Sequence, residues 1–227
     1  MRKPGTSPFV VLIGDIVRSR RLGKNRRARI QAQLAKTLVQ INRDYKKGIR
    51  TPLQFTGGDE FQGVFETAVP VFDVINQIRE VMSPVSVRFG IGIGEITTPL
   101  ADQPQAMDGP AFHRARDALE RAQEFVGQAC VSSGKPEQDE EVNAWFDALS
   151  SIRSRWSSRA LQVIHLYEDF QKLEPIAKKL KISVQAVSKH LRVTGYKAYK
   201  RGESALKRLL AAYNHIQPKK VEYKTST

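Results

Sequence analysis

One short stretch constrains the fold of this chain more than any other. Residues 55–65 read Phe-Thr-Gly-Gly-Asp-Glu-Phe-Gln-Gly-Val-Phe, with apolar residues on both sides of the Gly57-Gly58 pair. Because glycine adopts the backbone angles of a tight turn at little cost, this pattern predicts a β-hairpin. Asp59 and Glu60 follow at the bend, where carboxylates can bind a hard cation such as Mg²⁺. The alternative is an ordinary solvated hairpin that happens to carry two acids.

A second acidic position lies upstream, at the end of an apolar run. Residues 8–15 are almost continuously apolar and predict a strand covered on both faces, which ends in Gly14-Asp15-Ile16. Asp15 is a candidate metal ligand, or it caps the turn that follows the strand. A basic cluster comes next, either as counter-charge for a polyphosphate or as a solvated face; its members are Arg18, Arg20, Arg21, Lys24, Arg26, Arg27 and Arg29.

The rest of the first half alternates between helical and strand patterns. Apolar spacing predicts helices over about 24–46, 68–82 and 110–127, strands over 50–56 and 61–66, and a short edge strand at 129–131. Residues 85–95 alternate, with Gly90, Gly92 and Gly94 opposite the apolar face, so either something approaches the backbone closely there or the strand is bulged.

This order of elements predicts an α+β, ferredoxin-like fold, an antiparallel sheet with helices packed on one face. In that topology the strands at 8–15 and 61–66 are central neighbours. The end of the first strand and the hairpin tip therefore fall at one sheet edge, and we expect Asp15 and Asp59 to meet there.

Several of these segments resemble a known group of enzymes and a bacterial family. Residues 11–17, Val-Leu-Ile-Gly-Asp-Ile-Val, resemble the first metal-binding strand of class III nucleotide cyclases. Residues 56–61, Thr-Gly-Gly-Asp-Glu-Phe, match the GGDEF signature of diguanylate cyclases, which share the same palm-type fold. Together with residues 88–95 and with 108–116, Asp-Gly-Pro-Ala-Phe-His-Arg-Ala-Arg, the combination is similar to the SatD family. The resemblance covers about residues 8–130 and, with the C-terminal part, most of the chain.

The resemblance implies a palm, nucleotide-cyclase-like domain that binds a nucleotide with Mg²⁺ or Mn²⁺. The metal ligands carry over to Asp15, Ile16 and Asp59, with Glu60 beside them, and Asp15, Asp59 and Glu60 would be catalytic in an active enzyme. Two-metal sites activate the attacking oxygen and stabilise the leaving one. The chain departs from cyclases where Phe55 replaces the adenine-selecting lysine and His113 replaces the transition-state asparagine.

Candidate residues for binding a nucleotide or its phosphates come from both ends of this region. They are Arg18, Arg20, Arg21, His113 and Arg116. Arginine is always charged and binds phosphate in a bidentate way, which favours Arg116 as a phosphate clamp. His113 either binds such a ligand or satisfies a backbone carbonyl.

Charge is distributed unevenly along the chain. Residues 151–227 carry 17 Lys/Arg against 5 Asp/Glu, whereas residues 1–150 carry 20 against 18. An excess of this kind is typical of nucleic-acid-binding modules, although a basic tail can also serve solubility alone. Residues 137–170 have helical patterns, and residues 171–195 resemble a helix-turn-helix, in which Ser183 caps the second helix. Candidate DNA contacts are Gln185, Ser188, Lys189, Arg192, Lys197 and Lys200.

These patterns predict a palm-like domain at residues 1–135, a helical domain at 136–216 after a linker at 132–141, and a loose tail at 217–227. Without a long apolar run, and with Cys130 as its single cysteine, the chain is expected to be cytoplasmic. A single reader of this type suggests a homodimer. We expect a DNA-binding regulator that binds a nucleoside triphosphate or cyclic nucleotide. The alternatives are a metal-dependent nucleotidyl cyclase or nucleotidyltransferase and a dimerisation scaffold.

Overall fold

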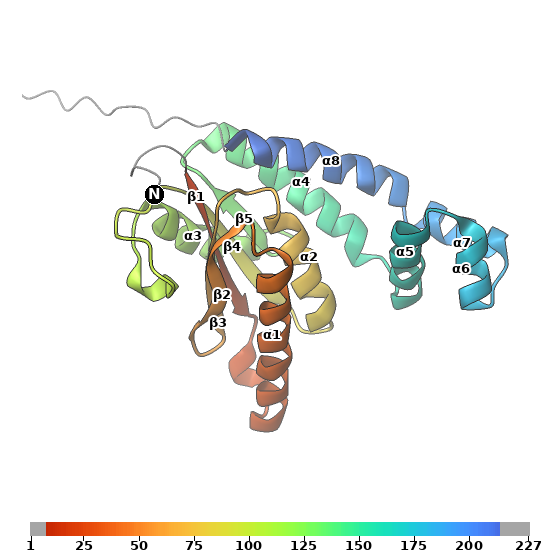
Figure 1. The fold of residues 1–227 in the computed structure, drawn as a ribbon, viewed down its shortest axis with the longest axis horizontal. Coiled ribbons are helices and arrows are strands. Elements are labelled where there is room, and N and C mark those ends of the chain that lie inside the picture. Colours follow the sequence, from red (N-terminus) through yellow and green to blue (C-terminus); the bar gives the residue numbers. More distant parts are fainter. Residues whose placement is uncertain (1–7, 214–227) are drawn as a thin grey trace, which may run out of the picture.

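The computed structural model describes residues 8–213 and has a five-stranded sheet with helices around it (Figure 1). The strands are β1 (Phe9–Ile16), β2 (Ile49–Gly57), β3 (Glu60–Phe65), β4 (Val87–Gly94) and β5 (Ala129–Ser132), in the order β2-β3-β1-β4-β5. The helices are α1 (Lys24–Asp44), α2 (Val71–Met82), α3 (Pro110–Arg121), α4 (Pro136–Ser154), α5 (Ser158–Phe170), α6 (Leu173–Leu180), α7 (Val184–Val193) and α8 (Tyr196–Ala212). The predicted α+β class and its palm-type, ferredoxin-like strand order are confirmed.

The sheet is centred on β1, which is antiparallel to both β3 and β4. Val10, Leu12 and Ile16 of β1 pack into one core, whereas Val11 and Ile13 pack into another. This alternation explains why the strand reads as a continuous apolar run, since both of its faces are buried. The predicted hairpin is confirmed, with Gly58 at its turn in the left-handed region at φ 57°.

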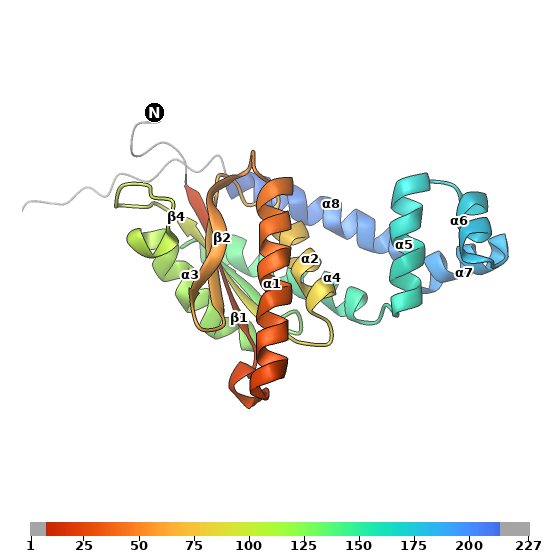
Figure 2. The ribbon, with the colours of Figure 1, turned by 60° about the horizontal axis from the view of Figure 1, so that its bottom comes forward.

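Helices cover both faces of the sheet, so the expectation of helices on one face only is wrong (Figure 2). On one face α1 and α2 lie over the larger core. On the other, α3 lies directly on β4, and a Cβ added at Gly90 or Gly92 would collide with the α3 backbone. Glycine at these positions lets α3 lie close to β4. Of the two explanations that the sequence offers for these glycines, the close approach is therefore the one observed. Helical spacing over 68–82 and 110–127 would also place Val81 and Val126 in the core, and this expectation is wrong, because both side chains are exposed. Val126 follows the end of α3 at Arg121.

The expectation of a purely antiparallel sheet also needs correction, since β5 runs parallel to β4. Its outer edge is covered by α4 through three polar side chains spaced four residues apart. Asp139 accepts a hydrogen bond from the Ser133 amide at 2.8 Å, and Asp147 accepts one from the Gly127 amide at 3.0 Å. Between them, Asn143 bonds both the amide of Val131 at 2.7 Å and its carbonyl at 3.0 Å. These bonds satisfy the edge that β5 would otherwise expose.

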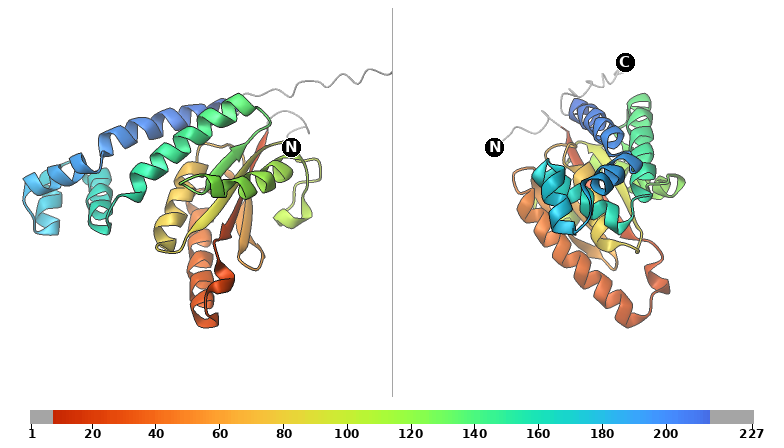
Figure 3. Two further views of the ribbon diagram at one scale, coloured as in Figure 1. Left: turned by 180° about the vertical axis from the view of Figure 1, so that it is seen from behind. Right: turned by 90° about the vertical axis from the view of Figure 1, so that its right-hand side faces the viewer.

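Because α4 begins at Pro136, most of the predicted 132–141 linker is helical. Figure 3 shows α4 and α8 side by side as they run away from the sheet. They are antiparallel: the Tyr213 hydroxyl donates to Asp139 at 2.9 Å near the sheet, and the rings of Trp156 and Tyr199 lie 4.7 Å apart at the far end. Apolar residues of both helices belong to the same core cluster as β1, α1 and α2. The division of the chain into domains at residue 136 stays a prediction.

The far end of this pair carries α5, α6 and α7, which share a small core of their own around Ile176 and Val187. Between α6 and α7 the chain turns at Lys181, which is left-handed at φ 54°. The Ser183 side chain then caps α7 by accepting a bond from the Ala186 amide at 3.1 Å, as the sequence predicts. No helix within residues 8–213 is long and apolar enough to cross a membrane. The predicted loose tail, 217–227, lies outside the described residues.

Candidate functional site

The hairpin tip and the end of β1 meet at one sheet edge, as predicted. The residue that faces Asp15 across the ladder is Glu60, however, and not Asp59. Asp59 precedes β3, and its side chain turns toward α1, whereas that of Glu60 is bonded to α3. The three acids thus lie at one edge, but their side chains turn to three different elements, α1, α3 and β4.

Asp59 is held by α1. Arg27 donates from Nε to Oδ1 at 3.1 Å and from Nη2 to Oδ2 at 2.8 Å, and Gln31 Nε2 donates to Oδ1 at 2.7 Å. The Asp59 side chain is only 6% exposed. Burial alone would raise the pKa of its carboxyl, but hydrogen bonds from Ser19, Arg27 and Gln31 outweigh burial and lower that pKa. Asp59 is therefore a charged carboxylate whose lone pairs are largely used.

Glu60 is held in the same way by α3. The Arg116 guanidinium bonds both carboxylate oxygens, with Nη2 to Oε1 at 2.9 Å and a short contact from Nη1 to Oε2. Thr56 and Gln62 also donate to Oε1, at 3.2 and 2.8 Å. Burial opposes ionisation, but the bonds from Arg116 and Gln62 outweigh it and lower the pKa of Glu60.

Asp15 is the least constrained of the three acids. Its one recorded side-chain partner among the described residues is Arg88 on β4, which donates from Nη2 to Oδ2 at 3.2 Å. Burial outweighs this contact and raises the pKa of Asp15, and the charges of Glu60 and Asp59 act in the same direction. The Nε of Arg88 is buried without a hydrogen-bond partner among these residues.

This arrangement does not fit a bound divalent cation. Carboxylate oxygens are the right donors for Mg²⁺, but those of Asp59 and Glu60 are engaged by arginines. Within the described part of the chain no three or more acidic, histidine or cysteine side chains gather where a metal ion could be held. Ile16 has a buried side chain, which leaves only its backbone carbonyl as a donor. The metal site at Asp15, Ile16 and Asp59 stays a prediction that requires the arginines to move.

The candidate phosphate-binding residues are not brought together by any recorded contact. Arg18 and Arg21 are exposed beside the start of α1, and the side chain of Arg20 lies outside what the structure describes. On α3, the Nε2 of His113 lies 3.1 Å from Oδ1 of Asp108, with both side chains well exposed. Arg116 is engaged by Glu60. Since α1 and α3 cover opposite faces, these residues approach the edge from two sides.

Reasoning from the sequence missed the partners that neutralise the acids. Arg27 and Gln31 are four residues apart on α1 and so share a helix face. Arg88 alternates with the apolar residues of β4 and lies directly across from Asp15 in the ladder. The alternating pattern, combined with the pairing of β1 and β4, would therefore have identified Arg88 as the partner of Asp15. Arg27 could not be singled out among seven neighbouring cations.

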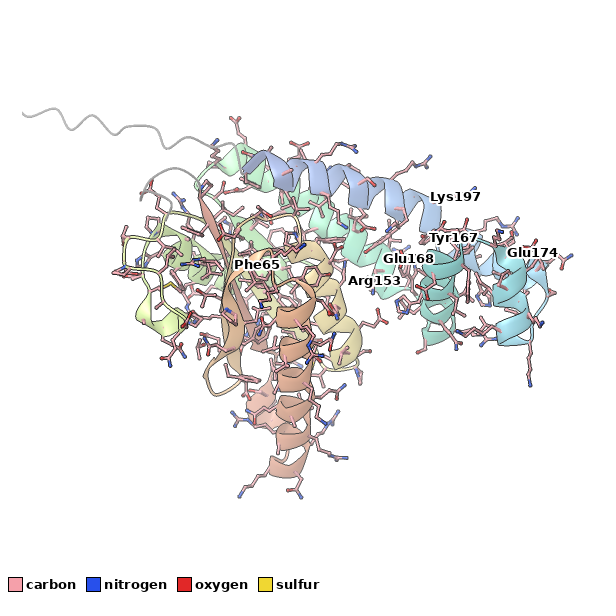
Figure 4. All side chains as sticks on the ribbon, in the orientation of Figure 1. Phe65, Arg153, Tyr167, Glu168, Glu174 and Lys197 are labelled. Carbon is pink, nitrogen blue, oxygen red and sulfur yellow. The ribbon has the colours of Figure 1, made fainter. Side chains whose placement is uncertain are left out.

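The candidate DNA contacts on α7 share one exposed face. Gln185, Ser188, Lys189 and Arg192 are all exposed, at spacings of three, four and seven residues from the first. Lys197 is exposed on α8, as Figure 4 shows where this helix begins. Lys200 differs, because its Nζ lies 2.7 Å from Glu203 and 3.3 Å from Glu168. Its charge is already paired within the chain.

The family model described as the SatD family matches residues 9–210. The chain belongs to the SatD family. Among curated proteins, no sequence matches this SatD chain.

Solved structures with partial similarity include nucleotide cyclases and a regulator. A bacterial light-regulated adenylyl cyclase is 16% identical, covering 53% of this SatD chain and 72% of its own, at a TM-score of 0.40. The adenylyl cyclase CyaB from P. aeruginosa is 17% identical, with 53% and 74% covered, at 0.39. A regulator of polyketide synthase expression from Bifidobacterium adolescentis is 14% identical, with 92% and 80% covered, at 0.28.

Proposed function

We propose that this SatD protein is a DNA-binding regulator whose sheet edge binds a nucleotide. The observation that carries the proposal is the outer face of α7, which presents Lys189 and Arg192 to solvent with no ion pair to any described residue. A short helix after a tight turn, with polar and basic side chains on its outer face, suits insertion into the major groove of DNA. The α6–turn–α7 unit is then a helix-turn-helix, with α7 as its recognition helix.

The proposed roles of the individual residues follow from what they offer. Gln185 and Ser188 offer donors and acceptors for base edges, and Lys189 and Arg192 offer donors for guanine or phosphate. Lys197 is proposed as a backbone contact. Lys200 would contact phosphate only by giving up Glu168 and Glu203, which makes it the weakest candidate of the set.

The effect of nucleotide binding would be passed from the sheet to α6 and α7 through helices that pack against one another. Arg153 of α4 bonds Glu80 of α2 at 2.6 Å, and His165 of α5 lies 3.3 Å from the same carboxylate. Figure 4 places Arg153 close to where α4 meets α5, and the core that contains α2 continues through α4 and α8. A ligand that prefers one arrangement of these helices would shift the population of DNA-binding states. A homodimer would present two readers to two half-sites.

For the nucleotide we propose contacts from His113 and Arg116 on α3 and from Arg18, Arg20 and Arg21 before α1. The alternative, a metal-dependent cyclase or nucleotidyltransferase using Asp15 and Asp59, requires two carboxylates free to bind metal. Asp59 is bonded by Arg27 and Gln31 instead. The arginine pairs therefore favour ligand sensing over turnover.

The DNA proposal is tested by selecting bound sequences from a random duplex library with the purified full chain. Affinity for the selected duplex is then measured for Lys189→Ala and Arg192→Ala. Each is expected to weaken specific binding by about 1–3 kcal/mol, because a bidentate base contact contributes that much discrimination. Arg208→Ala is the matched control, since Arg208 is an exposed α8 cation outside the reader. Equal losses for all three variants, or no selected sequence, would refute the proposal.

The nucleotide part is tested separately by thermal shift with each nucleoside triphosphate, with Mg²⁺ and with EDTA. A sensor gives a shift that Arg116→Gln reduces, without release of pyrophosphate. Pyrophosphate release that disappears in Asp59→Ala would establish the enzyme instead. No shift with any nucleotide would leave the sheet as a scaffold.

A further inference from the structure

We propose that the segment Arg18–Arg29, which we call the basic projection, is a second nucleic-acid contact that grips the phosphate backbone without a divalent cation. The proposal rests on the DNA-binding function proposed above and extends it to a surface remote from α7. It refines the assignment of Arg18 and Arg21, whose phosphate partners would belong to a polynucleotide.

The first observation is charge. The basic projection holds seven cations, Arg18, Arg20, Arg21, Lys24, Arg26, Arg27 and Arg29, and the sequence has no Asp or Glu between Asp15 and Asp44. The first turn of α1 also lacks an acidic residue, so the positive end of the helix dipole adds to the side-chain charge. A helix face that is merely solvated usually carries both positive and negative side chains, whereas the basic projection carries only positive ones.

The second observation is that this charge is not used inside the molecule. Arg18, Arg21, Lys24, Arg26 and Arg29 are all exposed. None of these five takes part in an ion pair or side-chain hydrogen bond recorded between described residues, in contrast to Arg27, which binds Asp59. The acids nearest to the projection are neutralised by their own arginines, so they do not repel an incoming polyanion.

The third observation is shape. In Figure 1 the lower end of α1, with the 3-10 turn Ser19–Arg21 beside it, extends past the sheet, and Figure 4 shows nitrogen-tipped side chains on several sides of it. Such a projecting end presents its charges outward, so it can follow the charges of a duplex, which repeat about every 1.7 Å along the axis. A nucleic-acid backbone is therefore the polyanion that fits.

The fourth observation explains how the projection is held in place. Arg27 and Gln31 of α1 both bond Asp59, and Gln31 Nε2 also donates to the Gly58 carbonyl at 3.0 Å. The hairpin tip thus fixes the first turns of α1 against the sheet. In this arrangement Asp59 is a positioning residue for the basic projection, and its carboxylate is engaged by Arg27 and Gln31 instead of a metal ion.

The test compares two triple variants of the full chain on a selected duplex and on a random duplex over a range of salt concentrations. Arg21→Gln/Arg26→Gln/Arg29→Gln removes three exposed charges from the projection. Lys36→Gln/Arg43→Gln/Lys46→Gln removes three exposed charges from the other end of α1 and beyond it. Each phosphate contact contributes about 0.9 to the salt slope, so the first variant should lower the slope by about 2–3 and weaken binding about tenfold or more on both duplexes.

The control triple should leave the salt slope near that of the wild type, and EDTA should change neither value. Equal slopes for the two triples, or binding that requires Mg²⁺, would overturn the inference. The proposed function is judged by a different readout, because Lys189→Ala should reduce the preference for the selected duplex without changing random-duplex binding. If Lys189→Ala loses its preference for the selected duplex as expected, but the projection variant keeps the salt slope of the wild type, the second contact is refuted and the proposed function is not.

Discussion

At the scale of single residues, the two carboxylates of the hairpin tip are paired with arginines from the neighbouring helices. Asp59 and Glu60 stand where metal-binding carboxylates are expected, yet Arg27 and Arg116 each grip one of them with two nitrogens. Bidentate pairs of this kind are among the stronger polar interactions in proteins. The hairpin tip is thereby bonded to α1 on one face and to α3 on the other.

Removing one partner of the α1 pair should destabilise the fold. Asp59→Asn leaves the Arg27 guanidinium beside a neutral group, so we expect unfolding free energy to fall by about 1–3 kcal/mol. Urea denaturation of Asp59→Asn, Arg27→Gln and the double variant gives the coupling energy between them. Asp44→Asn, which alters an exposed carboxylate on the same helix, is the control. Additive effects of the two substitutions would show that the pair is not coupled.

The same pairs predict how stability depends on pH. The pKa values of Asp59 and Glu60 are lowered from 3.8 and 4.5, so their contribution is complete above those values and is lost as pH falls through the folded-state pKa. The raised pKa of Asp15 acts oppositely, since protonation relieves its burial cost. Stability should fall below about pH 4 in the wild type and fall less in Asp59→Asn/Glu60→Gln. Denaturant midpoints measured between pH 3 and 6 check this, and parallel curves would contradict it.

At the scale of elements, close backbone packing joins α3 to the sheet. The alternating pattern of residues 85–95 correctly predicts a strand, and of the two explanations it left open for the glycines, a close approach and a bulge, the structure shows the close approach. The pattern does not identify α3 as the helix that packs there, because the pattern of a strand contains no information on which segment, about 20 residues further along the chain, packs against it. The polar stripe of Asp139, Asn143 and Asp147 was missed for a related reason: acids and amides after a turn are typical of loops, and only the position of β5 gives them partners.

Adding one carbon to this interface should be costly. In Gly92→Ala the new Cβ would lie inside contact distance of the Ala111 carbonyl and the Ala115 backbone, so α3 must shift. Overpacking of this kind typically costs about 1–3 kcal/mol. Gly57→Ala is the matched control, because nothing lies within 4 Å of its Cβ. The free energies of unfolding of both variants are measured by thermal and urea denaturation. Equal values for the two variants would show that α3 shifts away from β4 without loss of stability.

At the scale of the whole molecule, the core on the α1–α2 face of the sheet and the core shared by α5, α6 and α7 differ in size. The first extends from β1 through α2 into α4 and α8, ending at Tyr213. The second holds α6 and α7 with few fully buried residues, among them Ile176 and Val187. The sequence predicted both the sheet and the two short helices α6 and α7, since each has a local pattern; the DNA-reading role of these helices stays a prediction. It did not predict how they join, since that depends on long-range packing around Trp156 and Tyr199.

This difference in core size predicts two levels of local stability. Amide hydrogen exchange should show α6 and α7 opening with a lower free energy than β1 and β4, because they bury fewer apolar side chains. Exchange in α4 and α8 should follow that of the sheet. Protection in α7 as high as in β1 would show that α6 and α7 unfold only with the rest of the chain.

The paired helices α4 and α8 have a mechanical consequence. Near the sheet, Asp139 of α4 accepts hydrogen bonds from the Ser133 amide just after β5 and from the Tyr213 hydroxyl just after α8. At the other end, the Trp156 indole after α4 donates to the Thr194 carbonyl between α7 and α8 at 2.8 Å. Because α4 and α8 are joined to each other at both ends, a small tilt imposed on them beside β5 would also displace α7, the proposed recognition helix, at their far end.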